Sequence, residues 1–186
     1  TSLADLAAGR ELVWDNGKPE SGALKDQFPP QFFEFRDGQY AVEVVKNSSE
    51  LGIVKFTSLG IQGQWKFIRI SRTFSLAAGE SVIRCKVEIF NQRESMAPAT
   101  LTYWQHNFFG VKGEENTFFA PTGNGVRAFV PSDATNKELI RDLSRGWLAM
   151  LGKSGSGVVV LPEYRRLAYA YAWYCKGSGG LPVDTL

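Results

Sequence analysis

The chain of 186 residues has a single histidine, His106, and only two cysteines, Cys85 and Cys175. With one imidazole, a zinc site that needs several histidines is excluded, and so is any mechanism that uses two of them. Two cysteines cannot build the dense disulfide framework of a small secreted domain. The sequence therefore predicts no metal site and no cofactor, and any catalytic imidazole has to be His106.

The chain also lacks an excess of charge of either sign, with 21 Lys and Arg against 19 Asp and Glu. Such a balance offers no positive field for nucleic acid or for an anionic membrane. No apolar run approaches the about 20 residues that span a bilayer, and residues 1–9 lack the basic and apolar regions of a signal peptide. Nucleic acid is therefore not an expected partner, and no membrane span is expected.

Aromatic side chains are abundant, with 13 Phe, 6 Tyr and 5 Trp. A chain of this length can bury about 70% of its unfolded surface, so it needs no metal or disulfide to hold a core. No linker rich in proline or serine divides the chain, and no internal repeat is visible. The simplest prediction is one globular domain over residues 1–186.

Alternation of apolar and polar residues with a period of two dominates the chain and predicts β-strands. We expect strands at residues 31–36, 40–46, 51–58, 64–74, 82–90, 99–109, 116–120, 125–130, 147–151, 157–161 and 167–174. Turn-forming residues separate them, and helices do not alternate with them. The expected fold class is therefore all-β, an antiparallel β-sandwich.

One short helix is expected as an insertion between strands. Thr135 and Glu138 fit a capping box, a short apolar face follows them, and Gly146 can end the helix. In residues 82–90, Cys85 alternates in phase with Val87, so a buried thiol is expected there. A disulfide between Cys85 and Cys175 is left open.

Residues 103–109, with the sequence Tyr-Trp-Gln-His-Asn-Phe-Phe, combine aromatic rings with amide and imidazole groups. On a strand, Trp104 and His106 lie on one face and Asn107 on the other. Sugars are bound by an aromatic ring beneath the sugar and planar polar groups around its edge. Trp104 and His106 are thus the leading candidates for a carbohydrate site. The alternative is that Trp104 is core and His106 a hydrogen-bonded structural residue.

Other residues are weaker candidates for the same site. Asn107, Arg72 and Glu163 are polar groups that could reach the rim of a sugar. In residues 167–174 the aromatic side chains alternate with alanines, so Tyr171 and Trp173 form either a stacking platform or a thick core layer.

Four stretches together resemble the galactose-mutarotase-like supersandwich family: residues 21–28, 71–76 with 82–91, 104–109, and 146–151 with 157–160. The resemblance implies two curved antiparallel sheets with a sugar on a concave face. It also implies a role in glycan processing, a periplasmic or extracellular location, and other domains of a longer protein as partners. The chain is shorter than a full family domain, so an excised or shortened domain is an alternative to a complete one. Mutarotases use two histidines and a glutamate, and here only His106 can match, so mutarotase activity is not implied.

Three functions remain open from the sequence. The first is a carbohydrate-binding β-sandwich domain. The second is a carbohydrate-active enzyme, an epimerase, lyase or hydrolase, in which His106 and a carboxylate such as Glu163 exchange protons. The third is a structural or assembly domain without a ligand, whose aromatic side chains are all core.

Overall fold

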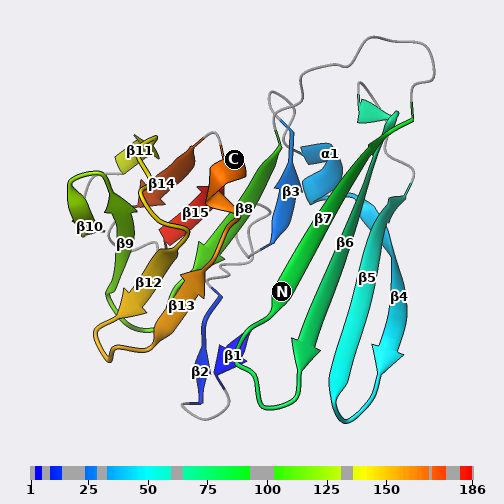
Figure 1. The fold of residues 1–186 in the computed structure, drawn as a ribbon, viewed down its shortest axis with the longest axis horizontal. Helices are drawn as coiled ribbons and strands as arrows, with labels where there is room; N and C mark the ends of the chain where they lie inside the picture. Colours follow the sequence, from blue (N-terminus) through cyan, green and yellow to red (C-terminus); the bar gives the residue numbers. More distant parts are fainter. Residues whose placement is uncertain are drawn as a thin grey trace. The chain divides into compact units, whose positions relative to one another are not determined.

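A computed structural model describes residues 3–5, 9–13, 24–28, 33–59, 65–92, 103–130, 136–167, 169–174 and 181–185. Its elements (Figure 1) are β1 (Ala4–Asp5), β2 (Arg10–Glu11), β3 (Lys25–Gln27), α1 (Phe33–Arg36), β4 (Gln39–Asn47), β5 (Leu51–Leu59), β6 (Ile68–Ala77), β7 (Arg84–Asn91), β8 (Trp104–Phe109), β9 (Asn116–Thr122), β10 (Gly125–Phe129), β11 (Asn136–Ile140), β12 (Leu148–Gly152), β13 (Gly157–Val160), the 3₁₀ helix η2 (Tyr164–Arg166), β14 (Ala170–Tyr174) and β15 (Leu181–Thr185). The predicted all-β, antiparallel class is confirmed.

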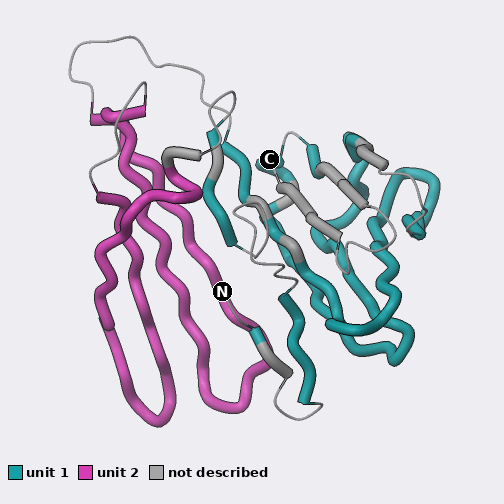
Figure 2. Tube along the Cα trace, turned by 180° about the vertical axis from the view of Figure 1, so that it is seen from behind, with its two compact units in different colours: residues 1–29, 102–186 teal, residues 30–101 magenta. Residues whose placement is uncertain are grey.

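The chain divides into two compact units, which are coloured separately in Figure 2. Unit 1 comprises residues 1–29 and 102–186, and unit 2 comprises residues 30–101. The single domain expected from the sequence stays a prediction, and each unit is described by itself.

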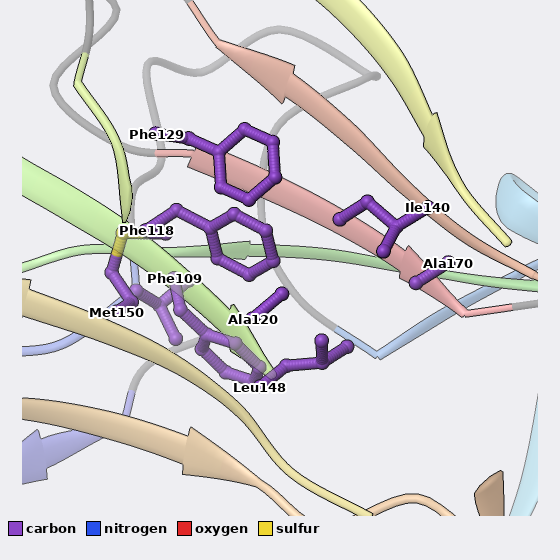
Figure 3. Packing of buried hydrophobic residues seen from close by; sticks show 9 residues of the cluster. Phe109, Phe118, Ala120, Phe129, Ile140, Leu148, Met150 and Ala170 are labelled. Carbon is purple, nitrogen blue, oxygen red and sulfur yellow. The ribbon is translucent and has the colours of Figure 1, made fainter. Parts of the chain in front are cut away.

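Unit 1 contains the small antiparallel sheet β1-β2 and two larger antiparallel sheets that share one core. One has the strand order β10-β9-β12-β13 and the other β11-β14-β15-β8-β3. The core takes Phe118, Phe129 and Met150 from the first sheet, and Phe109 and Ile140 from the second. Figure 3 shows these side chains meeting between the strands of the two sheets. Burying them removes apolar surface from water, which is the main force that holds a sandwich together.

The helix expected after Thr135 is wrong. Residues Asn136–Ile140 form strand β11, which pairs along its whole length with β14. Ile140 is 3% exposed and contributes to the core, while its neighbour Leu139 is 43% exposed. Alternate burial of this kind suits a strand at the edge of a sandwich, and the pairing with β14 overrides the local capping pattern. Thr135 itself lies outside the described residues.

Unit 2 is built on a single sheet with the strand order β4-β5-β6-β7, whose long strands lie side by side in Figure 1. Three of its strands, expected at residues 40–46, 51–58 and 82–90, are confirmed within a few residues. The strand expected at 64–74 begins later, because Lys66 and Phe67 form a turn before β6 starts at Ile68.

The strand expected at residues 31–36 is wrong, because Phe33–Arg36 form the single turn α1. Phe35 is 2% exposed there, and its carbonyl accepts a hydrogen bond from the Tyr40 hydroxyl at 3.1 Å. The Gly38 N–H also donates to the Phe35 carbonyl. Alternation of aromatic residues over so few positions fits one helical turn as well as a strand.

The register of the unit 2 sheet separates two faces. One face carries Val42, Val54, Phe56, Arg72 and Phe74, and we call it the Arg72 face. The opposite face carries charged residues such as Glu43, Lys55, Lys86 and Glu88, and we call it the wet face. On the wet face the Lys86 ammonium donates to the Glu88 carboxylate at 2.8 Å.

A β-bulge at Val45 interrupts β4, an outer strand of this sheet. Val44 pairs with Val54, whereas Lys46 pairs with Ile53, so Val45 has no partner position. One extra residue reverses the faces of the residues that follow it. Lys46 therefore lies on the wet face instead of the Arg72 face.

Cys85 is exposed, so the expected buried thiol is wrong. The predicted phase was correct, since Cys85 pairs with Phe74 and lies on the Arg72 face with Val87. The error is in the degree of burial, because much of this face is open: Val42 is 61% exposed and Val44 is 64% exposed. Cys175 lies outside the described residues.

Candidate functional site

Strand β8 carries the leading candidates, Trp104 and His106. Alternation along a strand places these two residues on one face of the five-stranded sheet, and Asn107 and Phe109 on the other. Phe109 is part of the unit 1 core, so the face with Asn107 is the inner one. The face that carries Trp104 and His106 is therefore the outer face of the sandwich.

Pairing across the sheet places a row of functional residues beside His106. In the antiparallel register His106 lies opposite Lys25 of β3 on one side and opposite Asp184 of β15 on the other. Asp184 in turn lies opposite Tyr171 of β14. Residues opposite each other on neighbouring strands have Cβ atoms about 4.5–5.5 Å apart and belong to the same face.

The row Lys25, His106, Asp184 and Tyr171, which we call the His106 row, combines four kinds of polar group. An ammonium, an imidazole, a carboxylate and a phenol supply hydrogen-bond donors and acceptors of both charges. Histidine and aspartate are also residue types that often share proton transfer near neutral pH. The row can therefore hold a polar ligand, and its central pair has the residue types of an acid/base pair.

Aromatic residues lie next to this row on the same face. Trp104 is two positions from His106 along β8, lies opposite Gln27 of β3 and is half-buried. Trp173 is two positions from Tyr171 along β14 and lies opposite Lys137 of β11. The predicted grouping of Trp104, His106, Tyr171 and Trp173 thus corresponds to one face of one sheet.

The other three sequence candidates have different positions. Asn107 is fully buried on the inner face, where its Oδ1 accepts from the Leu24 N–H at 2.9 Å and its Nδ2 donates to the Gln105 carbonyl at 3.3 Å. Arg72 belongs to the sheet of unit 2. Glu163 is exposed between β13 and η2 and pairs with Arg166 at 3.5 Å.

Buried polar contacts on the inner face attach β3 to β8. The Tyr103 hydroxyl donates to Asp26 Oδ1 at 2.6 Å, and Asp26 is only 1% exposed. The ring of Tyr103 also packs against Phe28, with centroids 5.5 Å apart. A buried carboxylate needs such a donor, because an unpaired one is costly. These contacts fix the register that brings Lys25 beside His106.

Leu24, at the start of β3, has a φ of 57°, which is unusual for a residue with a side chain. Its N–H is the group that donates to Asn107, so a buried amide holds the chain in this conformation. Asn107 therefore supports the outer face from beneath by fixing the start of β3.

Lys25 and Asp184 were missed by the sequence analysis. Both are charged residues in short strands without a clear alternating pattern, and they lie far from His106 along the chain. Only the register of three non-adjacent segments shows that they flank the histidine.

Some kinds of site are not seen in the part of the chain that the structure describes. Within it, no three His, Cys, Asp or Glu residues are grouped closely enough to hold a metal ion. Within the same residues, no helix is long and apolar enough to cross a membrane. A hollow beside the turn between β9 and β10 contains none of the sequence candidates; it is lined by Thr122, Asn124, Gly125, Val126, Arg127 and Asp142.

Comparisons of the chain with protein-family models, with curated proteins and with solved structures find no match.

Proposed function

We propose that the chain binds carbohydrate on the outer face of the five-stranded sheet. The observation that carries the proposal is the register that lines up Lys25, His106, Asp184 and Tyr171 beside Trp104. The resemblance to the galactose-mutarotase-like supersandwich family supports the same class of ligand and a role in glycan processing.

The chemistry of the face suits a sugar. A pyranose ring presents apolar C–H groups, which pack against an aromatic ring such as Trp104. Its hydroxyls both donate and accept, so they need mixed partners of the kind found in the His106 row. A sheet face is also rigid, which limits the conformational entropy that binding costs.

The test is a glycan array followed by calorimetry on the sugars that bind. The variant Trp104→Leu removes the stacking ring but keeps an apolar side chain, and we expect it to weaken binding at least about tenfold. Trp147→Leu is the matched control, because Trp147 is a half-buried tryptophan of the same unit that lies outside the five-stranded sheet. Equal affinity of the two variants would contradict the site, and no binding to any sugar would contradict the function.

A carbohydrate-active enzyme is the second candidate, and the position of Asp184 opposite His106 favours it. In that case Asp184, not the exposed Glu163, is the carboxylate that works with the imidazole. We expect turnover of a sugar that wild type binds, and in both His106→Gln and Asp184→Asn we expect turnover to fall much more than affinity. Sugar binding without any turnover would leave the binding domain as the function.

The structural or assembly domain predicts a different result. It requires that neither binding nor turnover is found and that Trp104→Leu lowers only the free energy of unfolding. Urea denaturation measured beside the binding assays separates this outcome from the other two.

A further inference from the structure

The two outer strands of the unit 2 sheet, β4 and β7, differ in their regularity. The bulge at Val45 interrupts β4, whereas all eight residues of β7 pair with β6 in one continuous register. Among the described strands, β7 has β6 as its only neighbour, and six of its eight residues are exposed. A regular and open outer strand is a surface to which a strand of another molecule can add.

Two hydrogen bonds show which backbone groups of β7 point away from β6. Just after β7, the Gln92 N–H donates to the Phe67 carbonyl at 2.8 Å. In β6, the Ile70 N–H donates to a serine hydroxyl of β5, so it points away from Ile89, which lies opposite it in β7. In an antiparallel pair, residues that bond across the pair alternate with residues that point outward. The N–H and C=O groups of Val87 and Ile89 therefore point outward from β7.

A second copy of β7 fits this edge in one antiparallel register. When Val87 lies opposite Val87 of the second copy, both residues direct their backbone groups toward each other and form a hydrogen-bonded pair. A two-fold axis then passes between them, so both molecules use the same surface. The register also places Lys86 opposite Glu88 of the second copy, and Glu88 opposite its Lys86.

The charges at this edge are complementary in the same register. Within one chain the Lys86 ammonium donates to the Glu88 carboxylate at 2.8 Å. A second copy gives each of these groups a further neighbour of opposite charge, in the positions of an antiparallel pair where side chains lie closest. Charged residues on an outer strand usually hinder the addition of another strand. Here their spacing hinders most other strands but favours a copy of β7.

Two exposed apolar side chains also gain neighbours in this register. Ile89 is 39% exposed and lies opposite Cys85 of the second copy, on the same face of the joined sheet. Phe90 is 40% exposed and lies opposite Arg84 of the second copy. Arg69 already packs over the Phe90 ring at 5.0 Å, so this ring is suited to a guanidinium. No two like charges of β7 lie opposite each other.

We propose that the chain forms a symmetric dimer through β7, in which the four-stranded sheets of two copies join into one continuous sheet. The contact is a strand edge, so its area lies at the small end of protein interfaces and the dimer should depend strongly on concentration. The proposal does not depend on carbohydrate binding, since it concerns a sheet of unit 2 and a second copy of the chain.

The first experiment measures the mass of the full chain by sedimentation, from low micromolar to near-millimolar concentration. We expect a reversible equilibrium between monomer and dimer, with the dimer increasing as the concentration rises. A monomer over the whole range would overturn the proposal.

Charge exchange at the edge tests the register. Lys86→Glu and Glu88→Lys each place like charges opposite each other, so each variant alone should raise the dimer Kd at least about tenfold. An equal mixture of the two variants brings opposite charges together again and should restore dimers. Lys46→Glu is the matched control, because it makes the same change of charge on the wet face of β4 and should leave the dimer as in wild type. Dimers that persist in both single variants, or a mixture that stays monomeric, would overturn the proposal.

A measurement on wild type keeps the proposal testable if a variant does not fold. In hydrogen exchange, the amides of Val87 and Ile89 should become protected as the concentration rises, because their N–H groups point outward in the monomer. The amide of Val42, on the other outer strand, is the internal control and should exchange at a rate independent of concentration. Equal gains in protection at Val42 and Val87 would show unspecific association and overturn the proposal.

Discussion

The sheet of unit 2 and the sheets of unit 1 have similar strand patterns but different surroundings. In unit 1 the apolar faces of two sheets meet, and Phe118 and Phe129 are 0% and 2% exposed. In unit 2 the register separates an apolar face from a charged one just as clearly, yet Val44 is 64% exposed. Alternation therefore shows which face of a strand is apolar, but not how completely that face is covered. The following predictions test this contrast, starting from the largest expected effect.

The largest difference is expected between two Phe→Ala substitutions. Phe118→Ala empties a site that is 0% exposed, next to the ring of Phe129 at 5.2 Å, and should lower the free energy of unfolding by about 4 kcal/mol. Phe74→Ala affects a half-buried ring of the Arg72 face and should cost about half as much, because part of that ring already contacts water. Urea denaturation measures both. Equal losses would mean that the Arg72 face is closed in solution.

A pair of Gly→Ala substitutions should give the next largest difference. A Cβ on Gly157 would overlap the carbonyl oxygen of Met150 and lie 2.9 Å from Leu151 Cα, so Gly157→Ala should cost about 3 kcal/mol. A Cβ on Gly52 of β5 would meet only the Leu76 carbonyl, at 4.0 Å. Gly52→Ala should therefore change the stability by less than about 1 kcal/mol. The midpoints of thermal unfolding give the comparison, and a large loss with Gly52→Ala would contradict the open structure of unit 2.

Two Tyr→Phe substitutions compare a partly buried hydrogen bond in each unit. Tyr103→Phe removes the donor to the buried Asp26 carboxylate and should cost about 2 kcal/mol. Tyr40→Phe removes a donor to the Phe35 carbonyl and should cost about 1 kcal/mol, because a neutral acceptor loses less. Both keep the aromatic ring, so packing changes little. A smaller loss for Tyr103→Phe than for Tyr40→Phe, measured by urea denaturation, would contradict the role of Asp26 as an anchor of β3.

The smallest effects are expected on the wet face and at the β6–β7 turn. A hydrogen bond from Arg84 holds the pKa of Glu80 below its ordinary value, and one from Lys86 does the same for Glu88. Because the folded-state pKa values are lowered, these pairs contribute stability above the unfolded-state pKa of glutamate. This contribution is lost as the pH falls through the folded-state values. Both pairs are exposed, so the change in stability should be slight and screened by salt.

Carbon-detected titration of the Glu80 and Glu88 carboxyl groups checks this prediction. Arg84→Gln should return the midpoint of Glu80 toward its ordinary value and leave that of Glu88 unchanged, which makes Glu88 an internal control. Equal movement of both midpoints would show a general charge effect instead of the pair bonded in the structure.

Much of the fold could be predicted because strand alternation is a local property. The long strands of unit 2 and the hairpin β12–β13 follow directly from their period of two. The errors arise where a short segment fits both a helix and a strand. A capping box predicted a helix where β11 forms, and closely spaced phenylalanines predicted a strand where the turn α1 forms. In β11 the pairing with β14 determines that the segment is a strand, and the local sequence around Glu138 does not indicate this pairing.

The candidate site could be predicted in part. Alternation of side chains along β8 and β14 was enough to place Trp104 with His106 on one face, and Tyr171 with Trp173 on one face. The charged neighbours of His106 could not be found, because Lys25 and Asp184 reach it from segments 81 and 78 residues away along the chain. Arg72 shows the opposite case: it was singled out for sugar binding, and the structure places it in the sheet of unit 2, in contact with three rings.

The bulge at Val45 has a consequence for the behaviour of many copies of the chain in solution. An outer strand presents unpaired N–H and C=O groups, to which a strand of another molecule can add in register. The bulge breaks the regular spacing of those groups in β4 and puts an extra residue, 50% exposed, in the way. We therefore expect the bulge to hinder such addition at this valine-rich edge. Deletion of Val45 would restore a continuous edge and leave Lys46 opposite Ile53 on the wet face, so it would change the solubility of the chain without changing the charge pattern of the sheet.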